Sequence, residues 1–117
     1  MRDLLSGLLC LCLVFLLVLE TGCTSAAIGD VSYGNRTLTV PVSSTADPVD
    51  AFIQVTVYKI RDLHQQELTT VQQPVHLASG ENTLQVPLSL EPGSYKLYIY
   101  ILKPGERQTA AIRDIVV

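Results

Sequence analysis

From about residue 31 onward, apolar and polar residues alternate one by one along the chain. A period of two is typical of β-strands that bury one face, whereas an amphipathic helix needs a period of 3.6. No segment in this region carries a helical stripe of apolar residues. The apolar positions are Leu38, Val40 and Val42; Ile53, Val55 and Val57; Leu84, Val86, Leu88 and Leu90; and Leu97, Ile99 and Ile101.

Clusters of Gly, Pro, Asn and Asp separate these segments and supply the φ angles that turns require. Because each strand has one apolar face to bury, we expect an all-β fold in which two antiparallel sheets pack face to face. Proline cannot donate to a strand ladder, so strands containing Pro41, Pro74 or Pro87 should be edges or be bulged there. About seven or eight strands are predicted, near residues 31–33, 36–43, 51–60, 67–72, 74–78, 83–90, 95–102 and 108–117.

The segment over residues 90–99, L-E-P-G-S-Y-K-L-Y-I, narrows the fold class. It resembles the corner of immunoglobulin-like sandwiches, where a Tyr opens the penultimate strand and its hydroxyl bonds to upstream backbone. The resemblance implies a small antiparallel immunoglobulin-like β-sandwich of about seven strands, with Tyr95 as the structural tyrosine corner. The same G-x-Y pattern occurs in transthyretin-like sandwiches, so it concerns architecture and says nothing of function.

The N-terminal segment is of a different kind. Residues 4–19 are almost wholly apolar, and the run is followed by Thr21, Gly22 and Cys23. Small residues and a cysteine after such a run resemble the lipobox of bacterial lipoprotein precursors, which are cut before the cysteine and lipidated on it. Glu20 departs from that pattern, because its position is normally Leu. The resemblance implies that Cys23 carries the lipid and anchors the protein to a membrane.

Cysteine usage agrees with a lipid anchor. The chain has three cysteines, Cys10, Cys12 and Cys23, and none follows residue 23. If the leader is removed, only Cys23 remains, and no disulfide can form within the domain. A lone free thiol is reactive in an oxidising compartment, whereas a thioether-linked cysteine is inert.

The chain is therefore expected to have three parts: a signal peptide over residues 1–22, a lipidated cysteine with a short linker over 23–30, and the β-sandwich over 31–117. Thr24 after the cysteine implies, by the same resemblance, lipid anchoring at the outer membrane of a bacterial envelope, facing the periplasm. Two alternatives remain open: an uncleaved membrane anchor, and ordinary secretion with cleavage after Ala27.

Composition argues against several functions. The formal net charge of −3 provides no cationic field to hold nucleic acid. His64 and His76 lack metal-ligand spacing. Asp47 and Asp50 share one loop, but two carboxylates fall short of the roughly six to eight oxygens that Ca²⁺ takes, so a turn is the expected role. No phosphate-binding glycine loop or nucleophile elbow is present. We expect a protein that is not an enzyme and has no catalytic residue, metal or cofactor.

One surface carries a candidate interaction site. The residues that alternate with the core positions of strands 51–60 and 95–102 should face outward, and an immunoglobulin-like sandwich places these two strands side by side. Tyrosine is rigid and amphipathic, and it is enriched at interaction hot spots. The alternative is cross-strand aromatic pairing that only stabilises the sheet. The predicted partner-binding residues are Phe52, Tyr58, Tyr98 and Tyr100.

These expectations describe a small membrane-anchored envelope lipoprotein that binds or tethers a protein partner, for example in secretion or surface-structure assembly. The inference rests on analogy of anchor and fold. One alternative is an inhibitor of a periplasmic hydrolase, for which Arg61-Asp62-Leu63-His64 is the nearest insertable loop. Another is a carbohydrate- or peptidoglycan-binding module that stacks sugars on the tyrosines.

Overall fold

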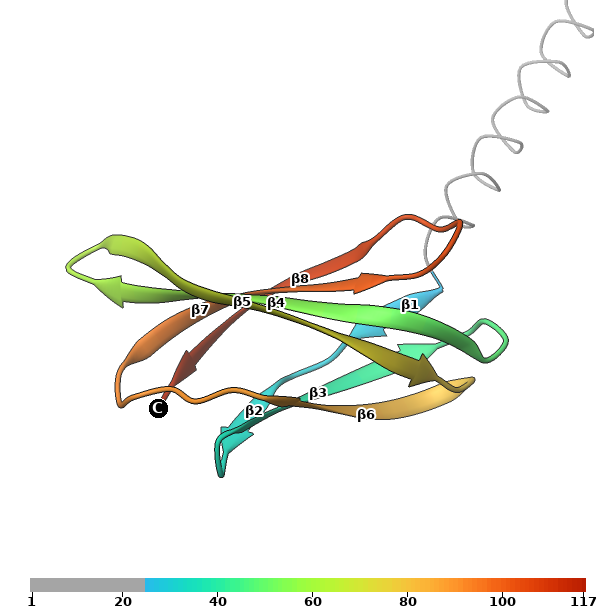
Figure 1. Ribbon diagram of the computed structural model, residues 1–117, viewed down its shortest axis with the longest axis horizontal. Helices are drawn as coiled ribbons and strands as arrows, with labels where there is room; N and C mark the ends of the chain where they lie inside the picture. Colours follow the sequence, from blue (N-terminus) through green and yellow to red (C-terminus); the bar gives the residue numbers. More distant parts are fainter. Residues whose placement is uncertain (1–24) are drawn as a thin grey trace, which may run out of the picture.

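The computed structural model describes residues 25–117, and this part of the chain folds entirely into β-strands and their connections (Figure 1). It contains no helix long and apolar enough to cross a membrane. The eight strands are β1 (Ala26–Ile28), β2 (Ser32–Gly34), β3 (Thr37–Ser44), β4 (Val49–Arg61), β5 (His64–Leu77), β6 (Gly80–Pro87), β7 (Ser94–Leu102) and β8 (Thr109–Val116).

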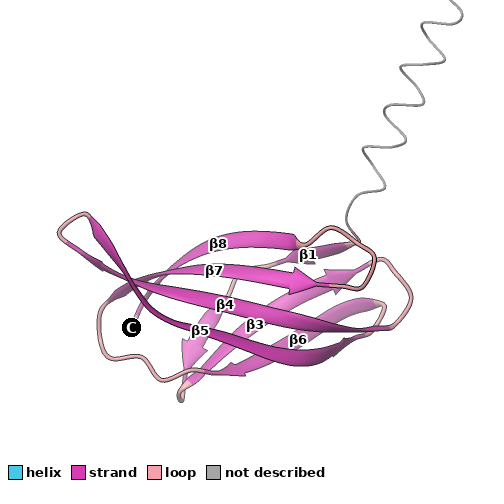
Figure 2. Cartoon of the chain, turned by 45° about the horizontal axis from the view of Figure 1, so that its top comes forward, coloured by secondary structure: helices cyan, strands magenta, loops and turns pink. Residues whose placement is uncertain are grey.

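The strands form two antiparallel sheets that lie face to face, as Figure 2 shows. In the first sheet β3 is central, with β6 along one side and β1 and β2 in turn along the other. The second sheet has the order β5-β4-β7-β8. The prediction of an all-β antiparallel sandwich is confirmed. If β1 and β2 are counted together as the first strand, β5 is the fourth. It pairs with β4 in the second sheet, whereas the constant-type immunoglobulin arrangement places its fourth strand in the first sheet.

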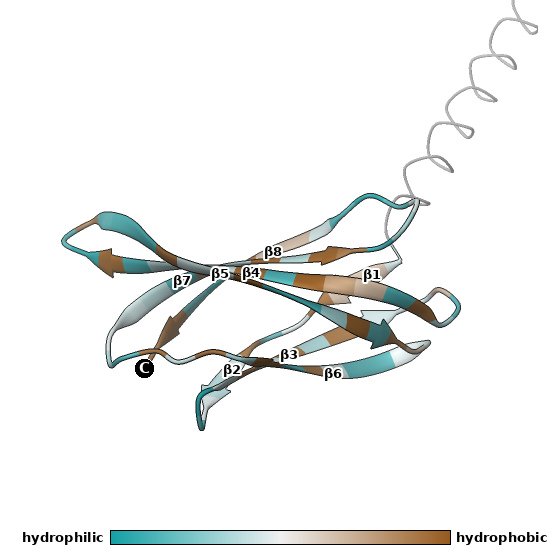
Figure 3. Cartoon of the chain, viewed as in Figure 1, coloured by the Kyte–Doolittle hydropathy of each residue, from teal (hydrophilic) through white to brown (hydrophobic). Residues whose placement is uncertain are grey.

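The alternation of apolar and polar residues produces the core directly. Figure 3 shows hydrophobic and hydrophilic positions alternating along the long strands. Burying one such apolar side chain contributes about 1.5–3 kcal/mol, so the facing rows of β3, β4 and β7 dominate the stability of the sandwich. The central residues of these rows are at most 1% exposed: Leu38, Val40 and Val42; Ile53, Val55 and Val57; and Leu97, Ile99 and Ile101.

The three prolines are accommodated in two ways. Pro74 in β5 and Pro87 in β6 lie on edge strands, as predicted. Pro41 lies in the central strand β3, so the expectation of an edge or a bulge was wrong there. Instead the neighbouring strand is interrupted at residues 29–31, between β1 and β2, opposite the missing N–H. The Gly29 N–H donates to the Pro41 carbonyl at 2.8 Å, and a Cβ on Gly29 would lie 3.1 Å from Pro41 Cγ.

The start of the sandwich also differs from the prediction. The linker was expected over residues 23–30 and the domain over 31–117. Ala26, Ala27 and Ile28 instead form β1 and pair with β3, so the sandwich already includes the first described residues. This strand could not be recognised from sequence, because it is three residues long and depends on tertiary pairing for its stability.

Two further boundaries were wrong. The segments expected over residues 67–72 and 74–78 are one continuous strand, β5, because a proline on an edge strand need not break it. Residues 88–90 belong to the connection between β6 and β7, whereas the prediction had placed them at the end of a strand over 83–90.

Two tyrosine hydroxyls hold this connection in place. Tyr33 on β2 donates to the carbonyl of Leu88 at 2.7 Å and accepts from the N–H of Leu90 at 2.8 Å. Tyr95 is 1% exposed at the start of β7, and its hydroxyl donates to the carbonyl of Glu91 at 2.6 Å. The Tyr95 contact is the kind of hydrogen bond that characterises a tyrosine corner.

Arg113 on β8 fastens the two sheets along one side. Its Nη2 donates to the carbonyl of Ile28 at 2.8 Å, and its Nε donates to the carbonyl of Gly29 at 3.2 Å. The guanidinium thereby satisfies carbonyl groups at the point where the first strand is interrupted. A charged donor makes a stronger hydrogen bond than a neutral one, so the Arg113 side chain alone can hold the edge of the first sheet against the edge of the second.

Candidate functional site: the outer face of the second sheet

All four predicted interaction residues lie on the outer face of the second sheet. Phe52 and Tyr58 belong to β4, and Tyr98 and Tyr100 belong to β7. The two strands are hydrogen-bonded neighbours. The positions between these residues point into the core and are buried, so the alternation turns the aromatic side chains outward.

The tyrosines nearest the β4–β5 hairpin contact each other directly. The rings of Tyr58 and Tyr98 lie 5.1 Å apart with an interplanar angle of 70°, an edge-to-face arrangement. The hydroxyl of Tyr98 also donates to Oε1 of Gln65 on β5, at 3.5 Å. This pair stabilises the sheet, and it leaves both side chains partly exposed.

The surface continues along β4 and β7 to the other end of the sheet. Phe52 lies opposite Leu102 and is 46% exposed. Tyr58 lies six positions after Phe52 along β4, which corresponds to about 20 Å of extended strand. The aromatic residues therefore form a band that runs most of the length of the sheet.

One residue of this surface was missed by the sequence reasoning. Ile112 on β8 lies opposite Tyr98 and is 55% exposed. Alternation within β8 was the available signal, but its inward positions are only half-buried, so the contrast between its two faces is weak. Leu102 was expected to face outward and lies in the same row as Phe52. We refer to Phe52, Tyr58, Tyr98, Tyr100, Leu102 and Ile112 as the aromatic face.

A polar pair and an ion pair border the aromatic face at its two ends. Beyond Tyr98, Lys96 on β7 lies 3.8 Å from the carboxylate of Asp114 on β8. Beyond Phe52, Nδ1 of His76 lies 2.8 Å from Oδ1 of Asp50. An apolar centre with a charged and polar rim is the usual composition of a protein interface.

A shallow hollow opens next to Phe52. Its volume is about 530 Å³, and its walls include the side chains of Phe52, Pro74 and Pro104 together with the Asp50–His76 pair. Apolar rings next to one polar pair can hold a small apolar group and orient it with a hydrogen bond. The hollow lies at the same end of the sandwich as the beginning of β4.

The described residues contain no cluster of metal-ligating side chains. Between residues 25 and 117 no three His, Cys, Asp or Glu side chains lie close enough to hold a metal ion. His64 is exposed next to the β4–β5 turn, far along β5 from His76. Asn35 and Arg36 form the turn between β2 and β3.

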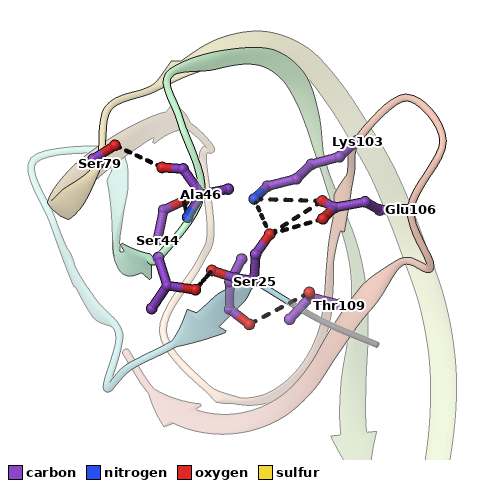
Figure 4. A network of polar contacts seen from close by, with 9 residues as sticks. Ser25, Ser44, Ala46, Ser79, Lys103, Glu106 and Thr109 are labelled. Carbon is purple, nitrogen blue, oxygen red and sulfur yellow. Dashed lines mark hydrogen bonds and ion pairs between the residues drawn. The ribbon is translucent and has the colours of Figure 1, made fainter. Parts of the chain in front are cut away.

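The predicted lipidation residue, Cys23, lies outside the described residues. The first described residue, Ser25, is held firmly at one end of the sandwich (Figure 4). Its carbonyl accepts from the N–H of Thr45 at 2.8 Å, and its hydroxyl donates to the carboxylate of Glu106 at 3.0 and 3.1 Å. Nζ of Lys103 donates to the same hydroxyl at 2.8 Å and lies 3.6 Å from Glu106.

Comparison with known proteins gives no family. The chain matches no protein-family model, and its sequence matches no curated protein.

Proposed function

We propose that this chain is a membrane-anchored envelope lipoprotein that holds a protein partner against its aromatic face and has no catalytic activity of its own. The observation that carries the proposal is the aromatic face itself. Six apolar or aromatic side chains on one sheet surface stay partly or largely exposed, while the core of the same sheet is fully buried. Exposed contiguous surfaces of this kind mark interaction sites more often than scattered single residues do.

A protein partner fits the chemistry of this face better than a sugar does. Ile112 is 55% exposed and Phe52 is 46% exposed. An aliphatic side chain such as Ile112 gains from burial against another apolar surface, whereas it offers nothing to sugar hydroxyls. The hollow next to Phe52 favours a second candidate, a glycan-binding module, because it combines ring walls with the Asp50–His76 pair.

The position of Ser25 determines how a lipid anchor would orient the sandwich. Only Thr24 separates Ser25 from Cys23. A lipid on Cys23 would therefore hold this end of the sandwich at the bilayer, and the aromatic face would stand roughly upright on it. Two or three acyl chains give stable anchoring, because each buried methylene contributes about 0.8 kcal/mol.

The anchor is tested by metabolic labelling of the full chain with palmitate in a bacterial host. We expect incorporation into the native chain and none into Cys23→Ser. Equal labelling of both chains, or of neither, would refute lipidation at this residue. The N-terminal sequence of the mature chain gives an independent readout, since cleavage before Cys23 is expected.

The role of the aromatic face is tested with a double substitution, Tyr98→Thr with Tyr100→Thr. Threonine keeps a high strand propensity, so the fold should be retained, as circular dichroism and thermal unfolding would show. The matched control is Glu81→Thr with Gln85→Thr, two exposed residues of β6 on the outer face of the first sheet.

Each chain is used in its native cells to capture partners after mild crosslinking. We expect one envelope protein to be reduced about tenfold or more by the tyrosine substitutions, since each buried tyrosine contributes on the order of 1.4 kcal/mol or more at an interface. The control should capture it normally. Identical capture by all variants would contradict the proposal. Cosedimentation with peptidoglycan that depends on the tyrosines would favour the glycan-binding candidate instead.

A further inference from the structure

The turn between β4 and β5 places a leucine where the backbone favours glycine. Asp62 and Leu63 have φ angles of 48° and 68°, the left-handed values of a type I′ hairpin turn. Asn-Gly is the preferred sequence for such a turn, because a side chain with a Cβ is disfavoured at left-handed angles. Leu63 is also fully exposed, at 101%. Within the described residues it therefore receives no burial that would compensate for the unfavourable backbone.

The hairpin that carries Leu63 extends past the rest of the sheet. Pairing of β4 with β7 ends at Lys59, whereas β4 continues to Arg61. Every residue over 61–70 is exposed. Figure 1 shows this hairpin projecting from the body of the sandwich. The tip can therefore enter a recess on another molecule without a clash from the sandwich.

A bulge separates this arm from the body. Val57 pairs with Thr69 and the next residue, Tyr58, pairs with Glu67, so Leu68 is an extra residue on β5. A bulge bends its strand and increases the local twist, and bulges recur where a protein redirects side chains for function. We define the arm as residues 59–68, from the residue after Tyr58 through the turn to the extra residue Leu68. Its side chains carry charges of both signs and two glutamines.

The arm points away from the end of the chain that leads to the anchor. Ser25 is hydrogen-bonded to Thr45, which directly precedes the loop into β4. The turn at Leu63 lies at the other end of β4, whose 13 residues span about 40 Å. The tip is thus the part of the hairpin farthest from Ser25.

We propose that the arm is an insertion device, in which Leu63 enters an apolar pocket on a folded protein partner, while Arg61, Asp62 and His64 form hydrogen bonds at the rim of that pocket. A bilayer is a poor match, because membrane insertion requires a broad apolar face, and here one apolar side chain stands among charged and polar ones. Leu63 is the side chain expected to enter the pocket, because it lies at the tip of the hairpin, is fully exposed and has a left-handed backbone. This contact is separate from the aromatic face, and it stands or falls independently of it.

The chain provides its own control for this proposal. Arg36 occupies the same place in the other turn of this type, with φ angles of 52° at Asn35 and 57° at Arg36. Leu63→Gly and Arg36→Gly both replace a left-handed residue with glycine, and both should leave the fold intact or more stable in thermal unfolding. Only Leu63→Gly removes the side chain that is proposed to enter the partner's pocket.

The experiment places a photo-crosslinking amino acid at Gln66, an exposed residue of the arm, in the full chain in its native cells. We expect one discrete protein adduct, reduced about tenfold or more by Leu63→Gly and unchanged by Arg36→Gly. Equal adducts with both glycine variants would overturn the proposal, as would the absence of a protein adduct. Adducts to lipid alone, or binding to phosphatidylglycerol–phosphatidylethanolamine vesicles that depends on Leu63, would also overturn it and would indicate a membrane contact.

Discussion

Substitution of Tyr33 by Phe should destabilise the sandwich more than the same change at Tyr95, although Tyr95 is the more deeply buried. The hydroxyl of Tyr33 makes two hydrogen bonds to the β6–β7 connection, to the carbonyl of Leu88 and from the N–H of Leu90. The hydroxyl of Tyr95 makes one, to the carbonyl of Glu91. Phenylalanine keeps the ring in both cases, so the comparison isolates the hydroxyl groups.

The expected loss in the free energy of unfolding depends on how many hydrogen bonds each substitution removes and on whether a backbone group is left without its partner. A net hydrogen bond contributes about 1 kcal/mol, so Tyr95→Phe should lower the free energy of unfolding by about that amount. Tyr33→Phe removes two bonds and leaves the Leu90 N–H without its partner, which predicts a loss of about 2–3 kcal/mol. For a domain of this size these values correspond to falls in Tm of about 5 °C and 10–20 °C.

The assay is urea unfolding of each variant followed by far-UV circular dichroism, with the m-value compared to verify that the unfolded states are alike. Tyr100→Phe is the control, because its hydroxyl makes no hydrogen bond within residues 25–117 and its loss should be nearly neutral. A loss for Tyr33→Phe equal to or smaller than that for Tyr95→Phe would refute the reasoning from hydrogen-bond number.

Three further predictions concern the contact between Gly29 and Pro41, the hydrogen bonds of Arg113 between the two sheets, and the left-handed residues in the two hairpin turns. Gly29→Ala should lower the free energy of unfolding by about 1 kcal/mol when Pro41 is present, because the new Cβ would press on the proline ring. In the Pro41→Ala background the same change should cost little or nothing, and a double-mutant cycle of unfolding free energies measures this coupling. Arg113→Met should cost about 2 kcal/mol and speed amide hydrogen exchange in β1, and unchanged exchange there would argue against a fastening role. Leu63→Gly and Arg36→Gly should each raise the free energy of unfolding by up to about 1 kcal/mol, and a loss of stability would show that the left-handed residues are not strained.

The inward and outward faces of the long strands were predictable from sequence because the side-chain period of a strand is two. Once Val55 and Ile99 are assigned to the core, Phe52 and Tyr98 must lie on the opposite surface. The placement of Tyr95 at the start of β7 was also readable, from the turn residues before it. These features depend only on local pattern.

The features that escaped prediction depend on contacts between distant segments. The strand at Ala26 forms because β3 offers it a partner, and its own residues show no strand pattern. A loop at Arg61–His64 was expected, but the start of β5 at His64 was not, because the two-residue turn lacks Gly or Asn and the polar residues after it show no alternation. The double hydrogen bond of Tyr33 depends on a loop more than fifty residues away, which no local signal indicates.

In the candidate site, too, the residues that follow local alternation were predicted, and those that depend on distant contacts were not. Four of the six residues of the aromatic face were named from alternation on β4 and β7, which pair as expected. Ile112 was missed because β8 is an edge strand and the inward residues of its pattern, Ala111 and Arg113 among them, do not resemble a core. The Asp50–His76 and Lys96–Asp114 pairs at the rim depend on which residues lie opposite each other on neighbouring strands, and alternation alone does not specify that register.

The interruption at Gly29 has a consequence for self-association. A long uninterrupted edge strand exposes a row of free backbone groups that can template a neighbouring copy and lead to aggregation. Here that border of the first sheet consists of two three-residue pieces, and the bend between them is covered by the guanidinium of Arg113. A neighbouring copy would find little to extend along this border, because the interruption opposite Pro41 divides it into two short pieces.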